Sequence, residues 1–418
     1  MRTFILLSQY AKMNVELVAN RTLRVDAKVI ALVGSAHFVS HFFQLTLPPL
    51  FPMLKQEFGV SYAMLGAVMS VFFAFSGVCQ TLAGFAVDRF GARAVLLAGM
   101  GLLAASCLIA GFAPIFWVLF PVMALAGVGN SVFHPADFSI LNASVAPQRL
   151  GHAYSVHGIG GNLGWAAAPM TSFALGSLFG WRAALIIMGG LGLAAMAFLM
   201  TQRASLVCHH RKGSAAHYSF SVSHIALLLR LPVIMCFAYF CFWSMATVGV
   251  QTFSVTTLTV AYHLPLALAT TALTGFLLGA SAGILAGGFA ATQTSRHSLV
   301  AAGGMLASAF FTLVLASAIV PSAFVVVLTT LMGFFLGMTV PSRDMLVRAA
   351  APAGATGRVY GFVYSGVDFG ASLAPLLIGW LLDRGHGAGI FIGIAGCMLL
   401  TMLTAVQIPR FARASAAA

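Results

Sequence analysis

Three histidines and one aspartate stand out in a chain that has few titratable side chains in its apolar segments. His37 and His41 lie four residues apart, while His134 and Asp368 each fall in another long apolar segment. Imidazole changes its charge in the physiological pH range, and a carboxylate inside a membrane-spanning segment is a functional candidate by default. We therefore predict that these four residues bind and release a proton. The alternative for each is a structural role in helix packing.

Polar side chains accompany these candidates at helical spacing. Gln44 shares a helical face with His37 and His41, and Asn130 shares one with His134. Such faces can hold a small polar molecule, and aromatic residues can enclose its apolar part; helix packing is the alternative, and for aromatic side chains the more frequent one. The predicted substrate-binding residues are Gln44, Asn130, His157, Asn162, Tyr239, Trp243 and Gln251.

The sequence predicts neither a metal site nor a catalytic centre. No carboxylate or thiolate lies within one turn of His37 or His41, and we interpret the histidine-rich stretch 202–230 as a solvated linker. Nucleotide-binding and hydrolase motifs are absent from the sequence. We therefore expect a protein that is not an enzyme, uses no cofactor, and draws work from a proton gradient.

Composition identifies the elements that must position these residues. Of 418 residues, 60% are hydrophobic and 7% are charged, whereas soluble domains have about 25% charged residues. A membrane crossing needs about 20 apolar residues. We predict an all-α polytopic membrane protein with twelve transmembrane helices. The predicted spans are 29–53, 61–87, 94–111, 115–141, 152–178, 182–201, 231–258, 267–290, 298–318, 322–346, 357–381 and 388–408.

Charge predicts the orientation of these spans. With both termini cytoplasmic, 18 of the 21 Lys and Arg residues fall on the cytoplasmic side, as the positive-inside rule expects. We predict a monomer in the plasma (bacterial inner) membrane that contacts anionic lipid headgroups and binds no nucleic acid. The predicted divisions are a cytoplasmic tail 1–28, a six-helix bundle 29–201, a cytoplasmic linker 202–230, a second six-helix bundle 231–408 and a cytoplasmic tail 409–418.

An internal repeat supports two six-helix bundles. A shift of 206 residues aligns Pro135 with Pro341 and places Asn162 opposite Asp368. The same shift aligns a stripe of small residues, in which Gly164 corresponds to Gly370. Small residues let helices approach closely in lipid, and paired six-helix repeats are typical of transporters that rock around a central site.

The loop between the second and third spans carries a recognisable motif. It reads Gly84-Phe-Ala-Val-Asp88-Arg89-Phe-Gly91-Ala-Arg93, and it resembles the signature loop of the major facilitator superfamily, except that Ala92 replaces a basic residue. The resemblance to this superfamily extends over essentially the whole chain. It implies that the loop is a latch for the outward-facing state.

The resemblance also implies partners for the latch and a second gate. Asp88 would meet the N-terminus of the eleventh span, and Arg89 or Arg93 would meet an acid at the end of the fourth span, here Asp137. Separately, Arg343 lies beside Asp344 near the inner end of the tenth span. We expect these two residues to pair at the gate; attraction of an anionic substrate by Arg343 is the alternative.

A narrower resemblance concerns the first, fourth and fifth spans. Their stretches Ala-His37-Phe38-Val-Ser40-His41, Phe133-His134-Pro135-Ala136-Asp137 and Gly160-Gly161-Asn162 resemble the fosmidomycin-resistance-type branch of the superfamily. Ser40-His41 replaces an Asn-Asp pair of that branch, and Asp137 lies one position later than its acid.

Three functions are open at this point. The branch resemblance implies proton-coupled export, by antiport, of a small organic or drug-like molecule. Proton-symport uptake of a small organic anion is the alternative, and a membrane sensor on the same fold that does not transport is the second alternative.

Overall fold

The computed structural model describes residues 2–146, 149–206, 229–350 and 356–417, and within these ranges its regular elements are all helical. The chain runs through α1 (Arg2–Gln44), η1 (Pro48–Leu50), α2 (Phe51–Phe58), α3 (Tyr62–Phe90), α4 (Ala92–Gly111), η2 (Phe116–Val118), α5 (Leu119–Ser131), α6 (Phe133–Ser144), α7 (Leu150–Thr201), α9 (Leu231–Val260), α10 (Leu266–Gln293), α11 (His297–Ala316), η4 (Ser322–Phe324), α12 (Val325–Met338), α13 (Val340–Ala350), α14 (Thr356–Asp383) and α15 (Gly387–Ala417). Most of the predicted linker 202–230 lies outside the described residues.

The described residues contain 11 helices or helical units long and apolar enough to cross a membrane. One of them, α7, is much longer than a single crossing requires. It changes direction at Gly180, whose φ of 79° and ψ of 160° are non-helical. Glycine adopts a positive φ without the clash that a Cβ atom would cause. The predicted boundary between spans 152–178 and 182–201 coincides with this break.

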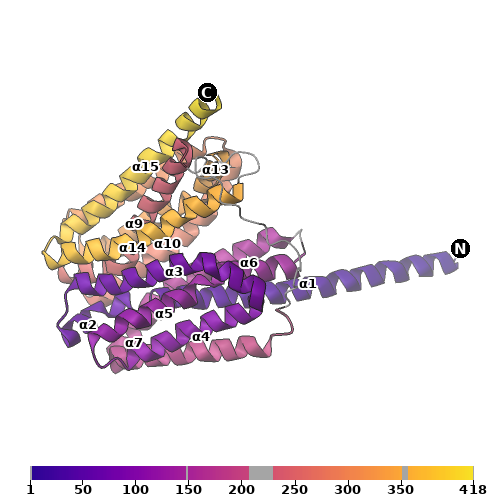
Figure 1. Cartoon of the computed structure of the whole chain (residues 1–418). Coiled ribbons are helices and arrows are strands. Elements are labelled where there is room, and N and C mark those ends of the chain that lie inside the picture. Colours follow the sequence, from indigo (N-terminus) through magenta and orange to yellow (C-terminus); the bar gives the residue numbers. More distant parts are fainter. Residues whose placement is uncertain (1, 147–148, 207–228, 351–355, 418) are drawn as a thin grey trace.

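The first helix begins within the predicted tail 1–28. α1 is continuous from Arg2 to Gln44, and its N-terminal part extends beyond the helical bundle (Figure 1). The predicted span 29–53 is not one helix. It breaks after Gln44, and the chain resumes with η1, which begins at Pro48 and Pro49.

Two helices are interrupted at equivalent positions of the repeat. α5 gives way to α6 at Val132, and α12 gives way to α13 at Thr339. Pro135 and Pro341, which the 206-residue shift aligns, each follow such an interruption. Proline has no N–H group to donate to the preceding turn, so it removes one hydrogen bond of the regular helix. Each half thus has an interrupted helix close to an aligned proline.

Each half is held together by the close helix contacts predicted from the glycine stripes. A Cβ atom at Gly164 on α7 would lie 2.2 Å from the carbonyl oxygen of Phe38 on α1. In the other half, a Cβ atom at Gly370 on α14 would lie 2.3 Å from the carbonyl oxygen of Cys241 on α9. Only glycine permits these backbone approaches, as is typical of helix pairs packed in lipid.

The two halves contact each other mainly along α3 and α14. A Cβ atom at Gly66 would lie 2.1 Å from the carbonyl oxygen of Pro375, and one at Gly379 would lie 2.4 Å from that of Tyr62. At Gly84, toward the other end of α3, no described atom lies within 4 Å of an added Cβ atom. The halves therefore touch at the α2 end and diverge toward the end that carries α13 and the N-terminus (Figure 1).

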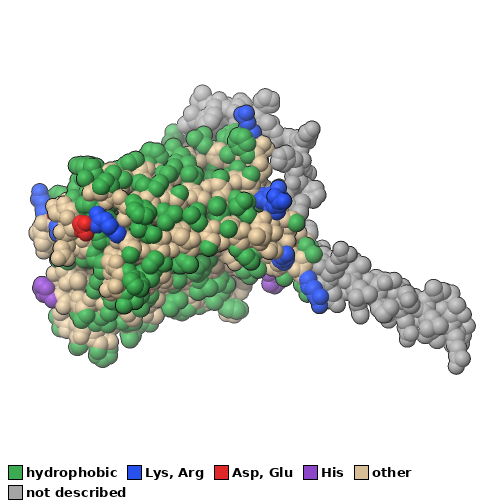
Figure 2. Space-filling view, turned by 90° about the horizontal axis from the view of Figure 1, so that it is seen from below, with side chains coloured by type: hydrophobic (Ala, Val, Ile, Leu, Met, Phe, Trp, Pro, Cys, Tyr) green, Lys and Arg blue, Asp and Glu red, His purple; other side chains and the backbone are tan. Residues whose placement is uncertain are grey.

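The surface of the bundle is that of a protein in lipid. Large hydrophobic side chains are exposed on the outer surface of the helices, including Phe85, Phe289 and Phe310. In Figure 2, hydrophobic side chains cover the middle of the visible face, while Lys and Arg side chains lie toward its ends. This distribution matches an apolar band bounded by polar headgroups.

Candidate functional site

The main candidate site is a cavity of about 150 Å³ between the two halves. Helices of both halves contribute to its wall. The lining residues are His37, Ser40, His41, Gln44, Phe73, Ser76, Gln80, Asn130, Phe133, His134, Trp165, Trp243, Ser244, Thr247, Val248, Gln251, Val367, Asp368 and Ala371.

A chain of side-chain hydrogen bonds lines the N-terminal wall of this cavity. Trp165 Nε1 donates to Gln44 Oε1 at 2.9 Å, and Gln44 Nε2 donates to Asn130 Oδ1 at 2.9 Å. Asn130 Nδ2 in turn donates to Ser76 Oγ at 2.8 Å. The chain joins α7, α1, α5 and α3, so it fixes the orientation of the amide groups that a polar substrate would meet.

Next to this chain, four histidine rings gather around one buried carboxylate. Asp137 on α6 is 0% exposed, and its Oδ2 lies 3.0 Å from Nε2 of His157 on α7 and 3.4 Å from Nδ1 of His37 on α1. The His37 ring lies 3.6 Å from that of His157, 4.2 Å from that of His41 and 5.2 Å from that of His134, measured between centroids. The predicted helical faces of the first and fourth spans therefore meet.

Asp137 lies away from the latch arginines in this structure. The family resemblance pairs it with Arg89 or Arg93 in the outward-facing state; here both arginines are exposed whereas Asp137 is fully buried. Its carboxylate faces the interior of the N-terminal half, where His157 and His37 lie close to it. Asp137 is thus part of the histidine cluster here, and its pairing with a latch arginine stays a prediction.

Asp368 provides the acidic group of the opposite wall. It lies on α14 and lines the cavity, packed so closely against α3 that a Cβ atom at Gly77 would lie 2.5 Å from its own Cβ. Ser372 bonds to the main-chain carbonyl of Asp368 and not to its carboxylate. Among the described cavity-lining residues, Asp368 is the only acid, so a proton there changes the charge of the wall.

The predicted substrate-binding residues divide into two groups. Gln44, Asn130, Trp243 and Gln251 line the cavity. The other three lie elsewhere: His157 is buried against Asp137, Asn162 is half-buried outside the cavity lining, and Tyr239 is buried in the C-terminal half beside Arg343.

Arg343 is enclosed by aromatic rings. Its guanidinium carbon lies 4.3 Å from the centroid of Phe240 and 4.8 Å from that of Trp243, and its Nε donates to Asp344 Oδ1 at 3.0 Å. The side chain is only 8% exposed. The predicted pair with Asp344 is present, but it lies within the C-terminal half and does not bridge the halves.

The latch loop has the turn that its glycine predicts. Gly91 has a φ of 87° and joins α3 to α4, a conformation that favours glycine. Asp88 and Arg89 are exposed, while Arg93 donates to the carbonyl oxygen of Arg203 at 3.0 Å. This hydrogen bond lies within the N-terminal half, and no described atom lies within 4 Å of a Cβ atom added at Gly84.

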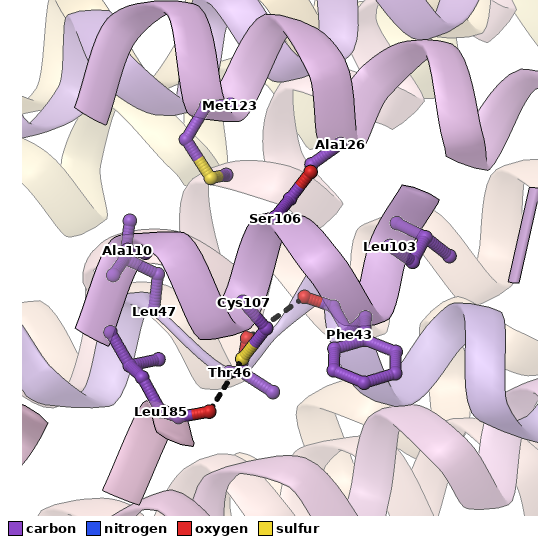
Figure 3. A pocket seen from close by; sticks show the side chains of 10 residues that line it. All are labelled: Phe43, Thr46, Leu47, Leu103, Ser106, Cys107, Ala110, Met123, Ala126 and Leu185. Carbon is purple, nitrogen blue, oxygen red and sulfur yellow. Dashed lines mark hydrogen bonds between the residues drawn. The ribbon is translucent and has the colours of Figure 1, made fainter. Parts of the chain in front are cut away.

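A second void lies inside the N-terminal half and is a less suitable site. Figure 3 shows its mostly apolar wall, in which Cys107 donates to the carbonyl oxygen of Leu185 and Thr46 to that of Phe43. Helices of the N-terminal half alone enclose it. Movement between the halves would therefore not expose it alternately to the two sides.

Sequence reasoning missed several polar residues of the cavity. Trp165, Gln80 and Ser76 line it, and Trp165 and Ser76 belong to the hydrogen-bonded chain. A signal was available: Trp165 follows Gly161 by one helical turn, and a Cβ atom at Gly161 would lie 2.6 Å from Nδ1 of His41. The face of α7 that approaches α1 therefore also carries Trp165, whose ring stacks on His41 with centroids 4.1 Å apart.

Comparisons with known proteins agree with this fold. The family model described as Major Facilitator Superfamily matches residues 33–272 and 252–416. The chain is 23% identical over 386 residues to the fosmidomycin resistance protein of Escherichia coli (strain K12), covering 91% of this chain and 93% of that protein. It is 24% identical over 386 residues to the membrane sensor protein UhpC of the same organism, covering 84% and 86%.

A solved structure has the same arrangement of helices. It is the inward-facing and occupied form of a bacterial homologue of the human lysosomal transporter Spinster, with a TM-score of 0.72, 13% identity, and coverage of 93% of this chain and 96% of that one. Together with the membrane-length helices, these matches identify an integral membrane protein of the plasma membrane, which is the inner membrane in a bacterium.

Proposed function

Because the chain belongs to the major facilitator superfamily, we propose that it is a proton-coupled secondary transporter that exports a small organic or drug-like molecule by alternating access. The observation that carries the proposal is the cavity between the halves. Its described lining combines amide, imidazole and aromatic side chains with one carboxylate. In this proposal the protein works as a monomer with twelve spans, counting α7 as two crossings, and both termini are cytoplasmic.

The charge distribution indicates which side of the membrane the open end of the structure faces in this proposal. The halves contact each other along the Tyr62 end of α3 and separate near Gly84. The positive-inside rule places the latch loop in the cytoplasm, so the separated end is the cytoplasmic one. The structure then corresponds to an inward-facing state, in which substrate enters the cavity from the cytoplasm.

Asp368 is the proton carrier in this proposal. It belongs to the C-terminal half and faces α3 of the N-terminal half, so its surroundings change when the halves rock. Loss of its charge on protonation makes closure over the apolar contacts of α3 and α14 less costly, because an uncompensated charge in a low-dielectric interior is strongly disfavoured. The sequence offered His37, His41 and His134 as further proton carriers, and these three also line the cavity.

The test begins with ligand identification. The purified protein is screened by thermal shift against organic acids, sugars, nucleosides and antibiotics, and each ligand found is then followed in proteoliposomes with an imposed pH gradient. Accumulation against its concentration gradient, abolished by a protonophore, is the expected result. Uphill transport of the ligand at a rate independent of the pH gradient would contradict proton coupling.

A sensor is the second candidate function, favoured by the similarity to a membrane sensor protein over 84% of this chain. A sensor binds its ligand without moving it. Stoichiometric binding with no flux in either direction would identify it. The direction of proton-dependent flux in the same assay separates export from the third possibility, symport uptake of an organic anion.

A further inference from the structure

Three imidazole side chains converge from three different helices beside the cavity. His37 of α1, His134 of α6 and His157 of α7 each offer one nitrogen atom, and these atoms all lie within 4.8 Å of one another. We call these three residues the histidine triad. No two of them lie on the same helix, which is why ligand spacing along one segment did not reveal them.

A carboxylate supports the triad from behind. Asp137 Oδ2 lies 3.0 Å from His157 Nε2, within hydrogen-bond distance. An ionised Asp137 would accept a hydrogen bond from His157 Nε2, which would leave the lone pair of this ring on Nδ1. Carboxylates placed behind histidine in this way are the usual outer partners of metal-binding imidazoles, because they fix the ring and increase its basicity.

Two buried polar atoms of this group have no hydrogen-bond partner among the described residues. They are His37 Nδ1 and Asp137 Oδ1. Unpartnered buried polar atoms are rare in folded proteins, and each asks for an explanation. A bound cation would compensate both the lone pair of the imidazole and the charge of the carboxylate.

Space for the rings is provided by one glycine. A Cβ atom at Gly161 on α7 would lie 2.7 Å from Cδ2 and 2.8 Å from Nε2 of His37. Any larger residue would displace the ring of His37 from its position beside His157. Where α7 approaches α1, its glycines therefore leave room for imidazole rings as well as for the backbone of α1.

From this geometry we propose that the histidine triad binds a divalent transition-metal cation of the Zn²⁺ class, with Asp137 as its supporting carboxylate. Imidazole nitrogen suits Zn²⁺, Co²⁺, Ni²⁺ and Cu²⁺, whereas Mg²⁺ and Ca²⁺ prefer oxygen ligands. His134 is exposed to the cavity, and His37 also lines it. The cation therefore enters from the cavity and stops at its wall.

This site lies within the N-terminal half alone. All its ligands come from α1, α6 and α7, and Asp368 of the other half is not among them. Metal binding and proton coupling through Asp368 are consequently separate properties. Failure of one in an experiment leaves the other intact.

The experiment uses the full-length protein without a polyhistidine tag, stripped of metal by chelator and titrated with Zn²⁺ in a calorimeter. The stretch 202–230 contains four histidines, so the parent for every variant carries alanine at His209, His210, His217 and His224. We expect this parent to bind one Zn²⁺ per chain. His134→Ala and His157→Ala should each weaken that binding by at least about tenfold.

Matched controls separate ligand loss from damage to the fold. His152→Ala removes an exposed histidine of the same helix as His157 and should bind Zn²⁺ as the parent does. His134→Cys supplies a thiolate in place of imidazole and should restore binding. With Co²⁺ it should also show the intense near-ultraviolet band of thiolate coordination, which no structural role of His134 would produce.

Two outcomes overturn the proposal. One is a parent that binds no stoichiometric Zn²⁺ while its unfolding temperature and elution volume remain those of the unmodified protein. The other is one-to-one binding that persists unchanged in both His134→Ala and His157→Ala, since the cation would then lie elsewhere.

Discussion

The carboxylate of Asp383 caps the backbone of Tyr62. Its Oδ1 accepts a hydrogen bond from the Tyr62 N–H at 2.7 Å, and its Oδ2 accepts one from the next N–H, that of Ala63, at 2.8 Å. Tyr62 begins α3 of the N-terminal half, and Asp383 ends α14 of the C-terminal half. The first N–H groups of a helix lack partners within the helix and carry partial positive charge. This contact therefore closes one end of the molecule between the halves.

Removing this cap should open that end. Asp383→Ala deletes an N-terminal cap of α3, which typically contributes about 1 kcal/mol, and should shift the balance between the two facing states by roughly fivefold toward the outward-open one. Labelling of single cysteines near Gly59, from outside intact vesicles, measures the shift. Glu57→Gln is the matched control, because Glu57 lies at the same end but bonds Trp181 and Arg182 of its own half. Equal labelling in Asp383→Ala and Glu57→Gln would contradict the capping role.

The latch loop should respond in the opposite direction. Asp88 is exposed in this structure, which the proposal takes as inward-facing. The family resemblance implies that Asp88 meets the N-terminus of the eleventh span in the outward-facing state, when the cytoplasmic end is closed. Asp88→Asn should therefore leave the inward-facing state unaltered, weaken the other state, and increase labelling from the cytoplasmic side. Double labelling from the two sides checks it. If Asp88→Asn and Asp383→Ala changed accessibility in the same direction, Asp88 and Asp383 would not close opposite ends of the protein.

Neutralising Asp368 should uncouple transport without abolishing it. Asp368→Asn keeps the volume of the side chain but cannot exchange a proton, so uphill flux should fall to the background of empty liposomes while exchange of labelled for unlabelled substrate continues. The measurement is the ratio of the two rates in proteoliposomes, together with its dependence on pH. Asp368→Glu should retain part of the uphill flux. Uphill flux at the parental rate in Asp368→Asn would remove this residue from coupling.

Glycine substitutions should separate tight from open helix contacts. Gly164→Ala places a methyl group 2.2 Å from the carbonyl oxygen of Phe38, so α7 must move from α1, at a cost of about 1–3 kcal/mol, as for other overpacked sites. Gly158→Ala and Gly190→Ala lie on the same α7 with no described atom within 4 Å of the new methyl group, and should be neutral or stabilising, since alanine favours helix. Thermal unfolding in detergent gives the comparison. A similar unfolding temperature for Gly164→Ala and Gly158→Ala would mean that the contact can relax.

The sequence predicted the helices better than their continuity. Apolar length and the 206-residue repeat placed the spans, and Gly164 and Gly370 make the close contacts expected of them. Charge placed the edge of the first span near residue 28 but left the secondary structure of the tail open. α1 continues through this residue, because charged side chains do not interrupt the backbone hydrogen bonds of a helix. The breaks near Pro135 and Pro341 were visible as prolines but were not interpreted as interruptions.

The site was predictable in its residue types and less so in its contacts. Helical periodicity put His37, His41 and Gln44 on one face, and that face does line the cavity. Periodicity also placed Asp137 on the same helical face as His134, and the family resemblance paired it with the latch arginines. Its contact with His157 follows from the packing of the helices, which brings the two side chains together. Spacing along one helix cannot encode such contacts between helices.

The hydrogen-bonded chain from Trp165 to Ser76 belongs entirely to the first half of the molecule, whereas Asp368 belongs to the second. In the proposed mechanism, the two copies of the repeat therefore contribute different groups to one cavity. The amide groups that would meet a cargo are fixed within the first copy, and the carboxylate that would carry the proton lies on the second. Substitutions in the amide wall could then alter the cargo while leaving that carboxylate in place.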